Sequence, residues 1–67
     1  MSQGIFNGDR LKEARLFNKK TITEVSNLLN ISKQMVSKYE KGKATPSEES
    51  LDILTRELEY PREFFFG

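Results

Sequence analysis

The side chains best suited to bind another molecule lie between residues 32 and 43. This segment carries four lysines, a glutamine and two serines, and positions 34, 37, 38 and 41 share one face of a helix. No acid lies on that face. Ammonium groups bind anions, and a glutamine amide both donates and accepts hydrogen bonds. The pattern indicates a surface that binds a polyanion; the alternative is the solvated polar face of any amphipathic surface helix.

Charge is unevenly distributed along the chain, although the net charge is only +1. Residues 1–18 carry a net charge of +1, residues 19–43 carry +4, and residues 44–67 carry −4. A basic middle beside an acidic end is expected when one face of a protein meets a polyanion. An ordinary patchwork of surface charge is the alternative interpretation.

Composition excludes several classes of protein. The 67 residues suffice for one domain, which we expect to span residues 1–67. Histidine and cysteine are absent, which excludes zinc-stapled and disulfide-rich scaffolds, and we expect no metal, no cofactor and no catalytic residue. We do not expect an enzyme, because hydrolysis would need an unusual serine–lysine or carboxylate pair. No run approaches the ~20 apolar residues of a membrane span, so we expect a cytoplasmic protein without a membrane partner.

The elements that position the basic segment are expected to be helices, because no stretch alternates apolar and polar residues as a strand does. The pattern predicts an all-α fold with four helices and a short fifth. Their ranges are about 8–17, 22–29, 33–41, 47–58 and 61–65. The first helix is expected to follow Asn7 as its cap and to bury Leu11, Ala14 and Phe17, with Phe6 packed just ahead of it.

Local signals predict where the helices begin and end. Thr21 and Glu24 have the spacing of a capping box, in which each side chain binds the backbone amide of the other residue. Ser32 is expected to cap the next helix, and Gly42 to end it. The last long helix is expected to begin near Ser47, or alternatively at a Thr45 cap with Pro46 first, and Pro61 suits the first position of the final turn. The last long helix buries Leu51, Leu54 and Leu58.

Residues 22–39 meet the demands of two short helices that cross at a steep angle. Such a crossing needs a small residue at the contact, an apolar residue at the corner and apolar anchors on the second helix. Ser26 is the small residue, Ile31 fills the corner, and Val36 and Tyr39 are the anchors. Asn30 tolerates the left-handed conformation that ends the first helix. With the anchors facing inward, the basic face of the second helix points outward.

Together these motifs resemble the phage-repressor and Cro type of helix-turn-helix, the XRE family. The resemblance runs from Phe6 to Phe65 and implies a five-helix, lambda-repressor-like bundle. It also implies a transcriptional regulator, a repressor, that binds a specific double-stranded DNA operator. The residues that carry it are 10–15, Thr21, 24–26, 31–34, Val36, Ser37, Tyr39, Glu40, Gly42, Lys43, Pro46 and Ser47.

The resemblance implies a role for each residue of the basic segment. The base-contacting residues are expected to be Lys33, Gln34 and Lys38, since glutamine can bond adenine at two atoms and lysine favours guanine. The residues expected to contact the DNA backbone are Lys20, Thr21, Ser32, Ser37, Lys41 and Lys43. The resemblance also implies a structural ion pair between Arg15 and Glu40.

Two positions depart from the pattern of the family. Ile22 stands where the family often has a phosphate-binding glutamine, and Lys20 stands where it usually has an apolar residue. We expect Lys20 to supply a replacement contact near the positive end of the helix that follows it. Met35 is expected to be a packing residue, with contact to a thymine methyl group as the alternative.

The C-terminal segment bears on the partners of the domain. Phe64, Phe65 and Phe66 are hard for so small a core to bury, and at least one of them is expected to close the bundle. The others would form a dimer interface or a junction to a following domain. The ending at residues 61–66 further resembles regulators in which a zinc peptidase domain follows. We therefore expect a homodimer on DNA or a part of a longer chain; an antitoxin role is also compatible.

Overall fold

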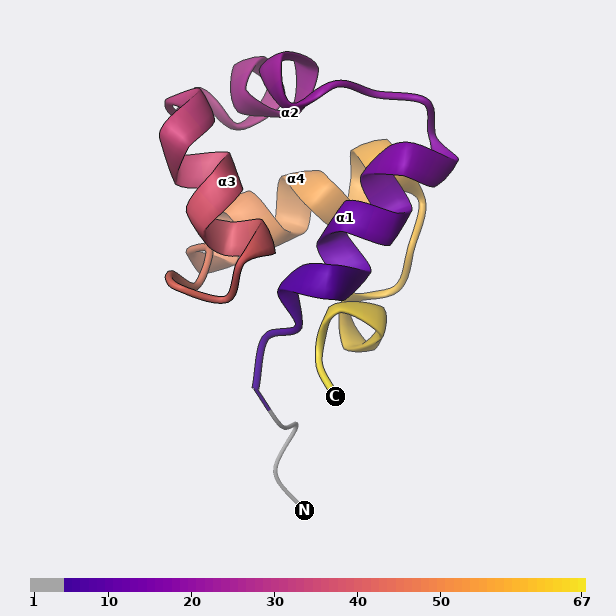
Figure 1. The fold of residues 1–67 in the computed structure, drawn as a ribbon. Coiled ribbons are helices and arrows are strands. Elements are labelled where there is room, and N and C mark those ends of the chain that lie inside the picture. Colours follow the sequence, from indigo (N-terminus) through magenta and orange to yellow (C-terminus); the bar gives the residue numbers. More distant parts are fainter. Residues whose placement is uncertain (1–4) are drawn as a thin grey trace.

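Residues 5–67, which the computed structural model describes, form four α-helices and one 3₁₀ turn (Figure 1). The helices are α1 (Gly8–Phe17), α2 (Ile22–Leu29), α3 (Lys33–Glu40) and α4 (Glu48–Leu58), and the turn is η1 (Arg62–Phe65). The predicted all-α fold is confirmed. Within the described part of the chain, no helix combines the length and the apolar character that a membrane span requires.

The predicted short fifth helix is a single 3₁₀ turn, Arg62–Phe65, rather than an α-helix, and Pro61 is its N-cap rather than its first residue. The Phe64 amide donates to the Pro61 carbonyl oxygen at 3.0 Å, and the Phe66 amide donates to the Glu63 carbonyl oxygen at 3.1 Å. Each hydrogen bond joins residues three apart in the sequence, which is the spacing of a 3₁₀ helix. The chain cannot continue as a helix, because its last residues run antiparallel to the segment before α1. There the Asn7 amide donates to the Phe65 carbonyl oxygen at 2.7 Å.

One hydrophobic core joins all four helices and η1. Val36 and Tyr39 of α3 and Leu51, Leu54 and Leu58 of α4 are buried as predicted. On the apolar side of α2, Val25 and Leu29 are buried and Leu28 is half-buried. Phe65 is the one phenylalanine of 64–66 that is completely enclosed. Phe64 and Phe66 pack against this core while partly exposed. The core residues are Phe6, Leu11, Ala14, Val25, Leu29, Val36, Tyr39, Leu51, Leu54, Leu58 and Phe65.

The first helix begins as predicted, but its inward face differs. The Asn7 side chain accepts hydrogen bonds from the amides of Asp9 and Arg10, so it caps the helix. Phe17 was expected in the core and is 82% exposed. With 3.6 residues per turn, Phe17 lies well away from the face that carries Leu11. The polar residues Arg15 and Asn18 take the inward positions of the last turn instead.

The ends of α3 and α4 differ from the prediction by one residue. Lys41 is the C-cap of α3 rather than its last residue, and Gly42 follows with a φ of 75°, the predicted left-handed conformation. Ser47 is the N-cap of α4, and its hydroxyl accepts from the Ser50 amide at 3.1 Å. The alternative start at a Thr45 cap is therefore wrong.

The start of α1 lies in backbone contact with the end of α3. A Cβ atom added to Gly8 would lie 2.3 Å from the Tyr39 carbonyl oxygen and 2.5 Å from that of Glu40. Real Cβ atoms do not approach backbone atoms so closely. The lack of a side chain at Gly8 thus sets the distance between α1 and α3.

Candidate nucleic-acid interface

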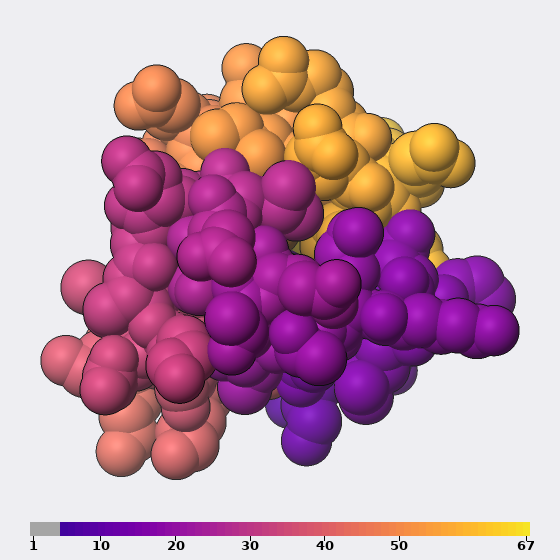
Figure 2. Space-filling view, turned by 90° about the horizontal axis from the view of Figure 1, so that it is seen from above, coloured from indigo at the N-terminus to yellow at the C-terminus, as the bar shows by residue number. Residues whose placement is uncertain are grey.

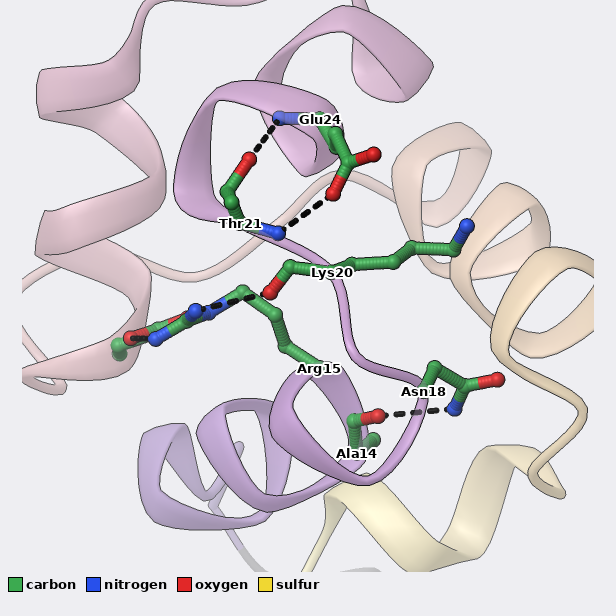
Figure 3. Close-up of polar contacts among 7 residues, drawn as sticks. Ala14, Arg15, Asn18, Lys20, Thr21 and Glu24 are labelled. Atoms are coloured by element: carbon green, nitrogen blue, oxygen red, sulfur yellow. Dashed lines mark hydrogen bonds and ion pairs between the residues drawn. The ribbon is translucent and has the colours of Figure 1, made fainter.

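The N-terminus of α2 is fixed by the predicted capping box. The Thr21 amide donates to the Glu24 carboxylate at 2.7 Å, and the Glu24 amide donates to the Thr21 hydroxyl at 3.1 Å (Figure 3). In any helix the next amides, here those of Ile22 and Thr23, have no acceptor within the helix. The cap therefore holds the exposed Thr21 at the positive end of the α2 dipole.

A tight turn sets the angle between α2 and α3. Asn30 has a φ of 58°, and the Ile31 amide donates back to the Ser26 carbonyl oxygen at 3.0 Å. Ser26 is buried where the two helices approach, and Ile31 packs against the core at the corner. The exposed Ser32 caps α3 by accepting from the Met35 amide at 3.1 Å. The sequence-predicted turn is thus present residue by residue.

The outer face of α3 carries the predicted base-contacting residues. Val36 and Tyr39 are buried, so Lys33, Gln34 and Lys38 are exposed together. Ser37 is half-buried at the side of this face, and Met35 is half-buried against the core. Over Lys33–Glu40, which the structure describes in full, no fully exposed residue is acidic. We call Lys33, Gln34 and Lys38 the α3 outer face.

The loop after α3 extends this basic surface. The Gly42 amide donates to the Tyr39 carbonyl oxygen at 3.1 Å, and the Lys43 amide donates to the Lys38 carbonyl oxygen at 2.8 Å. These two bonds are those of a Schellman motif, which reverses the chain at the end of a helix. Lys41 and Lys43 are exposed on either side of the reversal. The loop therefore holds two ammonium groups near the C-terminal end of α3.

Arg15 connects α1, α3 and the segment before α2. Its Nε donates to Glu40 Oε2 at 2.6 Å, and its Nη2 donates to Glu40 Oε1 at 3.2 Å. Its Nη1 donates to the Lys20 carbonyl oxygen at 3.1 Å (Figure 3). The two side chains are only 10% and 7% exposed. One buried guanidinium thus positions both the end of α3 and the start of α2.

Lys20 does not point toward α3. Its backbone carbonyl faces Arg15, and its side chain runs in the opposite direction, away from Arg15 (Figure 3). Lys20 as a whole is half-buried. The Lys20 side chain therefore leads away from Arg15, whose guanidinium binds Glu40 at the end of α3.

Sequence reasoning missed two features near this surface. Lys12, on α1, lines the same groove as Ile22, Ser37 and Lys41, which come from α2 and α3. Asn18 donates to the carbonyl oxygens of Ala14 at 2.8 Å and Leu58 at 3.2 Å and so ties α1 to α4. No local motif signals either contact, because each depends on how the helices pack.

The acidic residues of α4 and of the segment after it lie on a different part of the molecule from the α3 outer face. The exposed acids of α4 and the segment after it are Glu48, Glu49, Asp52, Glu57, Glu59 and Glu63. Seen from above, α3 lies at the left and α4 along the upper edge (Figure 2). The charge asymmetry of the sequence is thus also an asymmetry between two parts of the surface.

A capped helix, a left-handed turn and a second helix with an exposed basic face define a DNA-binding domain of the helix-turn-helix class. The family model for helix-turn-helix domains matches residues 11–65. The chain belongs to this family, in its XRE type, and is a DNA-binding domain of a transcription regulator. Searches of curated proteins and of solved structures find no match to the chain.

Proposed function

We propose that the domain binds a specific double-stranded DNA operator and acts as a transcriptional repressor. The observation that carries the proposal is the α3 outer face, which is exposed, free of acids and held outward by the buried Val36 and Tyr39. An α-helix fits the major groove of B-DNA, where each base pair presents a distinct pattern of donors and acceptors. The resemblance to phage repressors supports repression as the direction of regulation.

In this proposal α3 is the recognition helix. Gln34 lies in its first turn, where its amide can bond adenine N6 and N7 together, and Lys33 and Lys38 can reach guanine. Contacts to the DNA backbone come from the two ends of the motif. The residues proposed for them are Thr21, Ser32, Ser37, Lys41 and Lys43. A dimer would place two such helices one helical turn of DNA apart.

The salt dependence of binding tests whether the basic segment is a DNA surface. If four to six phosphates are neutralised per domain, a plot of log K against log salt should have a slope of about −3.6 to −5.4, or −0.9 for each phosphate. Fluorescence anisotropy with a labelled duplex between 50 and 200 mM salt measures this slope. A slope near zero would show that the basic segment does not meet phosphates.

A comparison of Gln34 with Lys43 separates base recognition from backbone contact. Gln34→Ala should weaken binding to the preferred site by about 1–3 kcal/mol and relax selectivity at one base pair, with no change of salt slope. Lys43→Ala should weaken binding to all duplexes alike and reduce the slope by about one unit, because Lys43 follows the end of α3, where this proposal expects the phosphates. Both side chains are exposed, so neither substitution should unfold the domain.

The preferred site is first selected from a pool of random duplexes at two salt concentrations. Each variant is then measured on three duplexes: the selected site, a one-base variant of it and a scrambled sequence. Equal weakening of all three by Gln34→Ala, or no effect on any of them, would show that Gln34 does not read a base. The assignment of the α3 outer face would then be withdrawn.

A further inference from the structure

We infer that Lys12 on α1 binds a DNA phosphate and replaces the contact that Ile22 cannot make. The inference rests on the proposed DNA-binding function. It starts from a groove between three helices, lined by Lys12 of α1, Ile22 of α2, and Ser37 and Lys41 of α3.

The groove joins two places where the DNA backbone is expected. Ile22 is the first residue of α2, directly after the Thr21 cap, and Lys41 is the C-cap of α3. The Ile22 side chain is apolar and packs against the core, so it offers a phosphate no hydrogen bond. A phosphate lying between these two helix ends would also lie near Lys12 of α1, which lines the same groove.

The charges around the groove favour an anion. The cations Lys12, Arg15 and Lys41 line it together with the carboxylates of Asp9 and Glu40. Glu40 receives two hydrogen bonds from Arg15, so these two charges neutralise each other. Two exposed lysines then remain against one exposed aspartate. An exposed ammonium group that meets a phosphate releases condensed counterions from the DNA.

Lys20 is the other lysine that could have replaced the contact, and its geometry is less suitable. It does not line the groove, and its side chain runs away from Arg15, which does line it (Figure 3). The inference thus gives Lys12 the phosphate-binding role that the sequence suggested for Lys20. The proposed site adds α1 to the DNA-binding surface of α2 and α3.

Three glutamine variants, each lacking one positive charge, test the inference. Lys12→Gln should reduce the salt slope of duplex binding by about one unit, while Lys20→Gln and Arg56→Gln should leave it unchanged. Arg56 is an exposed cation of α4 outside the groove, so its variant controls for the loss of net charge. Between 50 and 200 mM salt the Lys12→Gln variant should lose about threefold less affinity than the wild type. Thermal unfolding monitored by circular dichroism verifies that all three variants fold.

The outcomes distinguish this inference from the proposed function. If the wild type binds DNA with a steep slope and Lys12→Gln has the same slope, Lys12 does not meet a phosphate and the inference is overturned. If only the Lys20→Gln variant had a reduced salt slope, the phosphate contact would belong to Lys20 and the inference would be overturned. Equal losses in Lys12→Gln and Arg56→Gln would show a general effect of charge and would also overturn it. Failure of the wild type to bind any duplex would instead contradict the proposed function.

Discussion

Replacing Arg15 with alanine should lower the free energy of unfolding by about 3–5 kcal/mol, the usual cost of removing one partner from a buried ion pair. The substitution leaves the Glu40 carboxylate, 7% exposed, without its two hydrogen bonds from Arg15, and it also removes the bond to the Lys20 carbonyl oxygen. Glu40→Ala should cost a similar amount, because the guanidinium would then remain buried without its counter-charge. Urea unfolding followed by circular dichroism measures both losses.

The double variant provides the decisive comparison. Once one partner is gone, removal of the other costs little more, so the double loss should be smaller than the sum of the single losses by about 0.5–3 kcal/mol. Glu48→Ala is the control, because its ion pair with Arg62 is at the surface and Glu48 is 80% exposed. It should cost less than about 1 kcal/mol. Additive and small losses at Arg15 and Glu40 would show that this pair does not hold α1 and α3 together.

Gly8→Ala should destabilise the domain by about 3 kcal/mol, at the upper end of the usual range for overpacking. The new methyl group would overlap the carbonyl oxygens of Tyr39 and Glu40, and backbone atoms cannot rotate away as a side chain can. The helices α1 and α3 would have to move apart. A loss of stability would be informative, because replacing glycine with alanine in a helix otherwise stabilises it.

Gly42→Ala is the matched control for Gly8→Ala. A Cβ atom at Gly42 would meet nothing within 4 Å, so the substitution adds only the cost of a left-handed conformation. That cost is on the order of 1 kcal/mol. Chemical unfolding of the two variants side by side gives the comparison. A Gly8→Ala variant as stable as the wild type would contradict the close contact between α1 and α3.

The helix starts were predictable because the chemistry of a cap is local. Each cap can be recognised from a few adjacent residues, because its hydrogen bonds join positions three apart. The examples are Thr21 with Glu24, and Ser32 with Met35. Asn30 and Gly42 likewise predict left-handed turns, since asparagine and glycine adopt a positive φ more readily than other residues. The turn between α2 and α3 needs nothing from distant parts of the chain.

Two other left-handed residues gave no such signal. Lys19 and Glu59 have φ angles of 58° and 60°, although long charged residues rarely adopt this conformation. Lys19 follows Asn18, the C-cap of α1, and the next amide, that of Lys20, donates to the Arg15 carbonyl oxygen at 3.0 Å. The packing of the helices, rather than a local preference, imposes these turns. The prediction that Phe17 is buried failed for the same reason. It rested on the apolar character of the residue alone, whereas its exposure depends on how the helices pack.

The direction of exposed side chains was the least predictable part of the candidate site. Lys33, Gln34 and Lys38 follow from the burial of Val36 and Tyr39 on the same helix, so helical periodicity is enough to place them. The placement of Lys12 and Lys20 depends on how α1 crosses α3 and on where the Arg15 guanidinium lies. Both are consequences of tertiary structure, which a periodic pattern does not contain.

The separation of the acids of α4 from the lysines of α3 makes the domain an electric dipole. In the field of a DNA duplex such a molecule experiences a torque before it makes any contact. If the α3 outer face meets DNA as proposed, the phosphates repel the acidic part and attract this face, so a larger share of diffusional encounters begins with α3 toward the duplex. The acids of α4 would then contribute to the rate of association without touching DNA, and added salt, which shortens the Debye length, would remove this contribution first.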